Sequence, residues 1–290
     1  MPRGVWLALG AYGLWGVLPV YWKWLQAVPA PQILAHRVVW SFLFLLGLIF
    51  LRRDAAALWR SVDRRNLAAY GMASTLLSVN WLTYIWAVNA GRIVETSLGY
   101  FINPLVSVLL GVVFFRERLR PWQWLAVGIA ALGVAYLTWQ HGALPWVALV
   151  LAGTFAFYGL LKKKAPLGSL PGLAFETGIL WLPAAAFLLA VEAGGNGQLG
   201  RAPVSTWALL IFTGVVTGLP LLLFSAAARR INLSTIGLLQ YVAPSCQLLI
   251  GVAVYHEPFD RVRWIGFTLI WTALAIYSIE SLWRMKWGRD

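Results

Sequence analysis

Residues 104–135 read PLVSVLLGVVFFRERLRPWQWLAVGIAALGVA, and residues 244–275, which lie 140 positions later, read PSCQLLIGVAVYHEPFDRVRWIGFTLIWTALA. Each stretch carries a proline within an apolar run, a glycine seven residues later and a glutamate six residues after the glycine. In the first stretch these residues are Pro104, Gly111 and Glu117. Apolar coincidences are common in a sequence of this kind, but this spacing is not. The two stretches therefore indicate an internal repeat.

The composition around the repeat excludes a soluble protein. Of the 290 residues, 60% are hydrophobic and 11% are charged, whereas soluble domains average roughly 45–50% apolar and about 25% charged residues. A mean hydropathy of +0.73 agrees. In a soluble chain the net charge of +13 would suggest nucleic acid, but here the basic residues fall in short loops and form no face that could follow a phosphate backbone. We expect the lipid bilayer as a partner, and no nucleic acid.

The apolar runs predict ten membrane-spanning helices. A hydrocarbon core of roughly 30 Å requires about 20 helical residues, and in lipid the backbone amides must be paired within helices or in a closed barrel. Barrel strands would be short and alternating, so the expected fold class is an all-helical membrane protein. The first five spans are residues 4–25, 33–51, 66–88, 93–115 and 121–139, and the second five are residues 144–161, 173–191, 204–228, 232–255 and 264–282.

The distribution of Lys and Arg predicts the orientation of these spans. With the N-terminus in the cytoplasm, 17 of the 23 basic residues fall on the cytoplasmic side, as the positive-inside bias requires. The sequence therefore predicts that both termini are cytoplasmic. Five helices per repeat is an odd number, so the second repeat inserts upside down relative to the first. We divide the chain into residues 1–140 and 141–290, an inverted-repeat architecture in which transporters place the substrate near the midplane between the halves.

Several motifs resemble the RarD branch of the EamA-type drug/metabolite transporters. They are AYGLWGVLPVYWK (residues 11–23), AHRVVWS (35–41), NWLTYIWAVNAGRIVETSLGYFINPL (80–105), GLAFET (172–177), TGLPLLLFSAAARRINLST (217–235) and GLLQYVAPS (237–245). The resemblance covers nearly the whole chain. It implies a multi-pass transporter, or permease, of the bacterial inner membrane, with the drug/metabolite transporter fold of ten helices in two inverted five-helix halves. Relatives in this superfamily export amino acids and other small metabolites, but the branch itself has no secure substrate.

Two prolines predict the centre of the substrate pathway. Pro104 and Pro244 each lie near the middle of a span, where a proline deprives the carbonyl four residues earlier of its amide partner. Lipid tolerates such a carbonyl only where protein or a wet cavity pairs with it again. Helical spacing then aligns a largely polar stripe of residues with each proline: Ser97, Tyr100 and Ser107 on the fourth span, and Gly237, Gln240 and Gln247 on the ninth. The alternative is that these polar groups only hold helices together.

Aromatic side chains near the same level predict a cage for a planar or amphipathic solute, although each one alone also fits ordinary packing. The cage would comprise Trp15, Trp81, Tyr84, Tyr100, Phe101 and Tyr241. With the polar stripes, it favours an aromatic or amino-acid-like substrate of mixed polarity. The predicted pathway residues are Trp15, Trp81, Tyr84, Ser97, Tyr100, Asn103, Pro104, Gln240, Tyr241 and Pro244.

Ionisable residues within spans are costly and are therefore candidates for gating or coupling. His36 and Glu176 are 140 residues apart, so they occupy equivalent positions on opposite sides of the membrane, which suits outer and inner gates. Glu95 is a candidate partner for Arg37 or Lys23, unless these two cations only extend to the headgroups. For proton coupling, Glu176 is the first candidate because burial favours its neutral form, and His36 is the second.

The sequence predicts neither a cofactor nor a catalytic site. It lacks a phosphate-binding loop, its three His and one Cys lack metal-ligand spacing, and no two carboxylates lie close together within the spans. We therefore expect a gradient-driven transporter that works by alternating access and exports small amphipathic metabolites or drugs. With no acid near the midplane, uncoupled transport is favoured over proton-coupled antiport. An intramembrane enzyme for lipid-linked substrates, a non-transporting sensor subunit and a homodimer remain alternatives.

Overall fold

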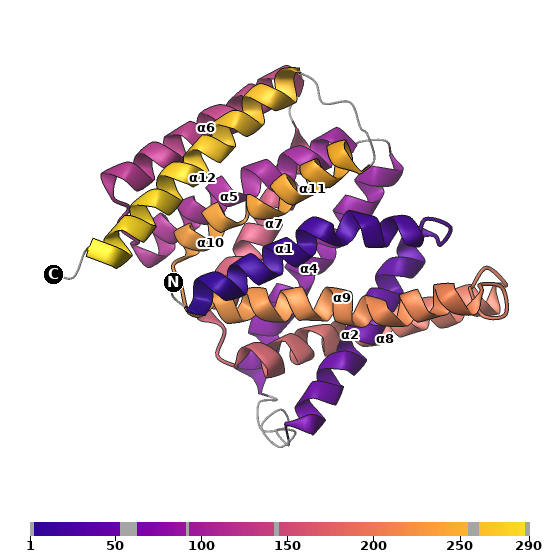
Figure 1. Cartoon of the computed structure of the whole chain (residues 1–290). Coiled ribbons are helices and arrows are strands. Elements are labelled where there is room, and N and C mark those ends of the chain that lie inside the picture. Colours follow the sequence, from indigo (N-terminus) through magenta and orange to yellow (C-terminus); the bar gives the residue numbers. More distant parts are fainter. Residues whose placement is uncertain (1–2, 53–62, 91–92, 142–144, 255–260, 288–290) are drawn as a thin grey trace.

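The computed structural model describes residues 3–52, 63–90, 93–141, 145–254 and 261–287, which are helical almost throughout (Figure 1). The side chains of Glu95 and Ser97, two of the predicted site residues, lie outside the described residues. The first half of the chain forms α1 (Arg3–Trp24), α2 (Ala30–Leu51), α4 (Arg64–Asn89), α5 (Ile93–Phe115) and α6 (Pro121–His141). The second half forms α7 (Trp146–Lys164), α8 (Ser169–Ala193), α9 (Val204–Ala228), α10 (Leu233–Leu239), α11 (Val242–Ala253) and α12 (Arg261–Trp287).

The all-helical fold class is confirmed, and each of the ten predicted spans has a counterpart in the described ranges. Eight described helices are long and apolar enough to cross a membrane, namely α1, α2, α5, α6, α7, α8, α9 and α12. The third and ninth spans differ: α4 carries polar residues such as Asn66, Ser74 and Asn80, and the ninth span is divided into α10 and α11, of 7 and 12 residues. The number of ten spans therefore stays a prediction.

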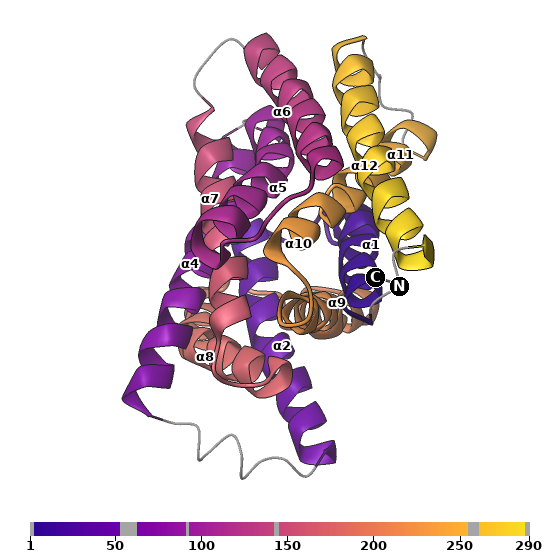
Figure 2. The same cartoon turned by 90° about the vertical axis from the view of Figure 1, so that its left-hand side faces the viewer.

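The helices pack with the two-fold symmetry that an inverted repeat predicts. The repeat pairs α1 with α7, α2 with α8, α4 with α9, α5 with α10 and α11, and α6 with α12. The contacts between helices follow the same pairing. Helix α5 contacts α7, and their counterparts α11 and α1 contact each other. In the same way, α2 contacts α9, and their counterparts α8 and α4 contact each other. Three contacts, α2 with α8, α5 with α10 and α6 with α12, join a helix to its own counterpart. Figures 1 and 2 both show α6 beside α12 at one edge, on the other side of the bundle from α2 and α8.

Basic residues gather at one end of the bundle, which we call the basic end. Arg120 at the start of α6 forms an ion pair of 2.6 Å with Glu280 near the end of α12. Lys163 at the end of α7 donates to the carbonyl of Ile231, which follows α9, at 2.5 Å. Gly4 in α1 lies against the same Ile231. The helix ends that the charge distribution assigns to one side of the membrane therefore meet in space.

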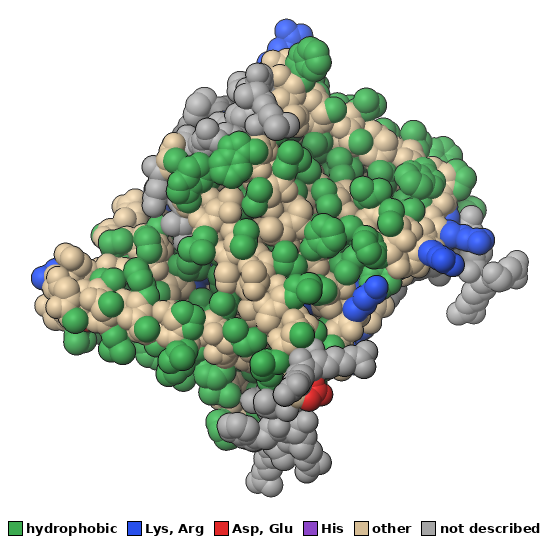
Figure 3. All heavy atoms as spheres, turned by 180° about the vertical axis from the view of Figure 1, so that it is seen from behind, with side chains coloured by type: hydrophobic (Ala, Val, Ile, Leu, Met, Phe, Trp, Pro, Cys, Tyr) green, Lys and Arg blue, Asp and Glu red, His purple; other side chains and the backbone are tan. Residues whose placement is uncertain are grey.

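The outer surface is mostly apolar, as lipid requires. Figure 3 shows hydrophobic side chains spread over the whole of one face, with Lys and Arg toward its margins. Large apolar side chains such as Leu132, Leu182 and Leu189 are exposed. A soluble protein rarely exposes so large an apolar area, so the surface agrees with the hydropathy of the chain.

Candidate functional site

The two proline-bearing helices meet at the symmetry axis. A Cβ atom added to Gly237 of α10 would lie 2.6 Å from the carbonyl oxygen of Pro104 in α5 and 3.0 Å from Cβ of Ser107. Only a glycine lets the two backbones approach this closely. The hydroxyl of Tyr241 donates to the carbonyl of Phe101 at 3.1 Å. These two residues are 140 positions apart, so the axis passes between them.

The two prolines have different local effects. Helix α5 continues through Pro104, whereas the ninth span breaks at Gln240 and Tyr241, directly before Pro244. At the break, the amide of Ala243 donates to the carbonyl of Gln240 at 3.2 Å. The carbonyl that Pro244 leaves free is thus paired locally, by a tighter turn. The span predicted over residues 232–255 is therefore made of two helices, which meet at this point.

Arg37 of α2 lies among aromatic side chains in the interior. Its Nε donates to the hydroxyl of Thr217 in α9 at 3.0 Å, and its guanidinium carbon lies 4.8 Å from the ring centroid of Trp22 and 4.9 Å from that of Trp81. Tyr84 and Tyr100 pack with their ring centroids 6.2 Å apart and lie close enough to interact electrostatically with Arg37. We call these six residues the Arg37 cluster.

The Arg37 cluster is partly accessible. Tyr84 and Tyr100 are 37% and 39% exposed, and Arg37 itself is half-buried. The cluster thus offers a cation, two indoles and two phenols to a small solute.

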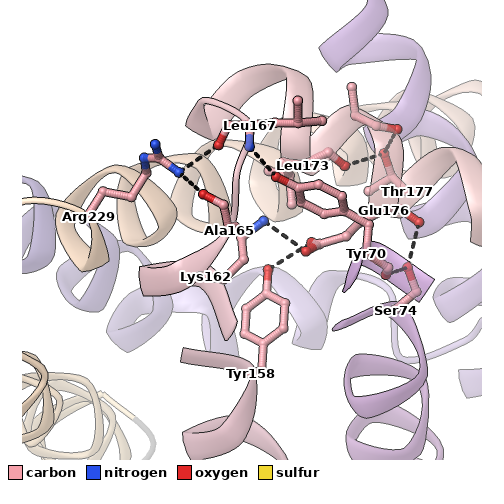
Figure 4. Close-up of polar contacts among 11 residues, drawn as sticks. Tyr70, Ser74, Tyr158, Lys162, Ala165, Leu167, Leu173, Glu176, Thr177 and Arg229 are labelled. Carbon is pink, nitrogen blue, oxygen red and sulfur yellow. Dashed lines mark hydrogen bonds and ion pairs between the residues drawn. The ribbon is translucent and has the colours of Figure 1, made fainter. Parts of the chain in front are cut away.

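Near the basic end, Glu176 of α8 is the centre of a buried polar network (Figure 4). Its Oε1 accepts a hydrogen bond from Nζ of Lys162 at 2.9 Å, and its Oε2 accepts one from the hydroxyl of Tyr158 at 3.1 Å. The side chains of Lys162 and Glu176 are 3% and 0% exposed. Ser74 donates to the backbone carbonyl of Glu176 at 3.1 Å, and the hydroxyl of Tyr70 accepts from the amide of Leu167 at 2.9 Å. The network joins α4, α7 and α8.

Polar contacts hold the basic end together. The cavity lined by Tyr70, Lys162 and Glu176 among others has a volume of about 70 Å³, which is too small for a drug-sized solute. Glu117 accepts hydrogen bonds from the amides of Leu233 and Ser234 at 2.7 and 2.9 Å, so the end of α5 is held against the start of α10. A carboxylate is well placed at a helix N-terminus. Within the described residues, no three His, Cys, Asp or Glu side chains lie close enough to hold a metal ion.

The structure places Trp81, Tyr84 and Tyr100 in the Arg37 cluster but directs two other rings of the predicted aromatic cage elsewhere. Trp15 packs against Phe155 and Phe224, with centroids 5.7 and 5.8 Å away. Phe101 packs edge-on against Phe267 of α12 at 4.9 Å, and Tyr241 is completely buried in the same apolar cluster. The six rings therefore do not form a single cage, because Phe101 of α5 and Tyr241, at the break between α10 and α11, turn toward α12.

The remaining predicted site residues occupy separate positions. Asn103 is buried and accepts a hydrogen bond from Ser107 at 3.2 Å, while Gln240 is buried at the break between α10 and α11. Nδ1 of His36 accepts from the indole of Trp40 at 3.2 Å, and the imidazole packs against Trp207 near the start of α9. His36 and Glu176 thus lie toward opposite ends of the bundle, as their spacing predicts. Lys23 lies at the end of α1 and is exposed.

Sequence reasoning missed four members of these sites. Lys162 was grouped with the loop cations because it stands in a run of three lysines, and nothing in that run distinguishes the one that points inward. Tyr158 precedes it by one helical turn, a spacing that signals a shared face once Lys162 is known to be buried. Trp22 and Thr217 carry no local signal, because their role depends on helices that are distant in sequence.

Fold and site together define a multi-pass membrane protein with two interlocked halves. The EamA-like transporter family model matches residues 2–139 and again residues 144–279. An uncharacterized transporter of Pseudomonas aeruginosa is 46% identical, covering 97% of this chain and 95% of that protein. The uncharacterized transporter YojE of Bacillus subtilis is 44% identical, covering 99% and 96%, and the protein RarD of Escherichia coli is 42% identical, covering 98% and 96%.

A solved crystal structure shares the fold, with a TM-score of 0.70 and 18% identity over 95% of this chain and 97% of that one. The family model matches both halves of the chain, and the three relatives are similar over nearly its whole length, so these comparisons assign its family. The chain belongs to the EamA-like transporter family, in the branch that contains RarD, and has the drug/metabolite transporter fold. It is a multi-pass membrane transporter of that family.

Proposed function

We propose that this chain is a secondary transporter that exports small amphipathic metabolites or drugs across the bacterial inner membrane by alternating access. The observation that carries the proposal is the difference between the two ends of the pathway. The basic end is held together by Glu117, Lys162 and Glu176 with their partners, whereas Tyr84 and Tyr100 are partly exposed. A transporter must alternate between this state and its reverse.

Interlocked halves supply a mechanism for the alternation. Contacts such as Arg120 with Glu280 and Glu117 with Ser234 join the first half to the second at the basic end. In this proposal these partly buried polar contacts break when the halves rock around the contact of α5 with α10. In this proposal the basic end faces the cytoplasm, because that side then carries 17 of the 23 Lys and Arg residues.

Uncoupled transport is the favoured mode. Glu176, the first candidate for proton exchange, has Lys162 and Tyr158 as partners for its two carboxylate oxygens, an arrangement typical of a structural ion pair. His36 accepts a hydrogen bond from Trp40 and packs against Trp207. A proton-coupled antiporter is the second candidate, supported by the complete burial of the Lys162–Glu176 pair, since intramembrane ion pairs also occur in proton relays.

Flux into proteoliposomes tests the proposal. Purified protein is reconstituted, and the uptake of radiolabelled aromatic and amphipathic solutes is compared with uptake into empty liposomes. Accumulation that stops at equal concentrations on both sides supports uncoupled transport. Uphill accumulation driven by an imposed pH gradient, and abolished in Glu176→Gln, would establish antiport instead. Failure of every solute to move faster than in empty liposomes would contradict a transporter and favour a sensor subunit.

A further inference from the structure

The strongest unexplained feature of the interior is the terminal part of the Arg37 guanidinium. Its Nε donates a hydrogen bond to the hydroxyl of Thr217 at 3.0 Å. The ring centroids of Trp22 and Trp81 lie 4.8 and 4.9 Å from its guanidinium carbon. In the part of the chain that the structure describes, neither a carboxylate nor another acceptor contacts its two Nη groups. A cation within a span needs an anion or an acceptor to offset its desolvation.

Partly exposed phenol rings lie beside the residues that hold the guanidinium. Trp81, whose ring contacts the guanidinium, lies one helical turn before Tyr84 on α4. The ring of Tyr100 packs 6.2 Å from that of Tyr84, and the two tyrosines are 37% and 39% exposed. The Arg37 cluster therefore presents a fixed cation beside aromatic surfaces and phenolic hydroxyl groups.

This combination selects one ligand chemistry. The planar guanidinium fork matches a carboxylate through two parallel hydrogen bonds, and aromatic walls favour a flat ring attached to it. A zwitterionic amino acid would also require an acid for its ammonium group, and the described members of the Arg37 cluster include none. A neutral aromatic solute would leave the cation without a partner.

We propose that Arg37 binds the carboxylate of a small aromatic anion, and that the substrate of this transporter belongs to that class. The proposal rests on the proposed transport function, of which it specifies the substrate. Arg37 then orients the anion, while Trp81, Tyr84 and Tyr100 hold the ring. Thr217 and Trp22 keep the guanidinium in place before the ligand enters, which reduces the entropy lost on binding.

Binding measurements on the purified full-length protein in detergent test the proposal without requiring flux. Equilibrium dialysis uses radiolabelled benzoate, phenylacetate and indole-3-acetate, each beside its neutral amide, with acetate and phenylalanine for comparison. We expect at least one aromatic carboxylate to bind ten times more tightly than its amide, than acetate and than phenylalanine. Arg37→Gln should abolish this preference, and Arg37→Lys should weaken binding about tenfold, because an ammonium group cannot form the two parallel bonds. Arg261→Gln, an exposed cation at the start of α12, is the matched control and should bind normally.

A second measurement covers the case in which the Arg37 variants do not fold. In the wild-type protein, 2,3-butanedione modifies accessible arginines, and mass spectrometry reports modification at Arg37. An aromatic carboxylate should slow that modification at least threefold, and its amide should not. Equal binding of acid and amide, or no protection by any of the three acids, would overturn the proposal. Protection by phosphatidylglycerol alone would overturn it too, because Arg37 would then hold a lipid phosphate.

The outcomes separate this inference from the proposed function. Binding of an aromatic carboxylate without flux in proteoliposomes would leave the Arg37 site intact and contradict the transporter. Flux of neutral solutes, without binding or transport of the three acids, would leave the transporter intact and contradict the Arg37 site.

Discussion

Lys162 and Glu176 are almost completely buried, and each satisfies the charge of the other. Removing one partner from such a pair typically costs about 3–5 kcal/mol, whereas replacing both by apolar residues is often neutral. The pair is therefore a weak point for single substitutions but not an indispensable source of stability. Tyr158, which donates to the second carboxylate oxygen, adds a neutral hydrogen bond that either charge state of the pair can keep.

We expect Glu176→Gln to lower the free energy of unfolding by about 3 kcal/mol, because it leaves the Lys162 ammonium buried without a counter-charge. Thermal unfolding in detergent, followed by circular dichroism, measures the loss. The double variant Lys162→Met, Glu176→Leu should recover most of it. A single variant as stable as wild type would show that water reaches Lys162, in conflict with its burial.

Tyr100 and Gln240 are predicted to affect transport more than folding. Tyr100 is 39% exposed and belongs to the Arg37 cluster, and Gln240 lies where the ninth span breaks. Tyr100→Ala and Gln240→Ala should each lower the initial rate of flux roughly tenfold, equivalent to about 1.4 kcal/mol. Gel filtration checks folding, and Leu132→Ala on the outer surface of α6 is the control. Equal loss of folded protein in Tyr100→Ala and Gln240→Ala, with unchanged specific activity, would assign these residues to helix packing.

At the scale of residues, the sequence identified the ionisable groups of the site but not their partners. Arg37, His36 and Glu176 were found because a charge within an apolar run is rare. Lys162 was not, since helix rotation decides which of three consecutive lysines points inward. The predicted cage of six rings fails for the same reason: Trp81, Tyr84 and Tyr100 belong to the Arg37 cluster, whereas Phe101 and Tyr241 turn toward α12.

At the scale of elements, the crossing of α5 with α10 is a close helix contact on the symmetry axis. Gly237 makes it possible, because its backbone faces the carbonyl of Pro104 without an intervening side chain. The spacing of prolines in the sequence located this region correctly. The prolines did not predict the break at Gln240, because Pro104 stands at the equivalent position of the first repeat and leaves α5 continuous. The difference arises from packing rather than from proline itself.

Gly237→Val should destabilise the protein by roughly 1–3 kcal/mol, as overpacking of a tight contact does. A Cβ atom at this position would lie 2.6 Å from a backbone oxygen, which cannot move aside cheaply. Gly153→Val in α7 is the control, because a Cβ there meets nothing within 4 Å. The difference in melting temperature between the two variants isolates the effect of the crossing from that of helix propensity. Equal melting temperatures would mean that α10 shifts away from α5 without cost.

At the scale of the whole molecule, the alternation of helix direction gives a test of topology. The helix ends at Arg120, Lys163 and Glu280 meet at the basic end, which the charge distribution assigns to the cytoplasm. Reporters of cytoplasmic location should be active after Arg65, Arg120, Lys164, Arg230 and Asp290. Reporters of external location should be active after Ala30, Gly91, His141, Gly195 and Asp260. Two or more clear reversals would contradict ten spans with both termini inside.

The sequence predicted the order of the helices along the chain well, but it did not predict how they pack against one another. Hydropathy and loop charges indicated the order and approximate bounds of the helices, and the 140-residue repeat indicated their symmetry. Neither shows which helices touch, because side chains in lipid are apolar on every face and leave no amphipathic stripe to mark the buried side. The contact of α1 with α11, or of α7 with α5, could only be learned from the structure.

The packing of first-half helices against second-half helices has a consequence for how the protein is made. Because α5 packs on α7 and α1 packs on α9 and α11, the first five helices lack their main neighbours when they leave the ribosome. At about 5–20 residues per second, synthesis of the second half takes roughly 7–30 s. During that interval Arg37 and the backbone carbonyls of α5 would meet lipid or insertion machinery instead of their final partners. Newly made first halves are therefore the form of this protein most dependent on membrane chaperones and most exposed to quality-control proteases.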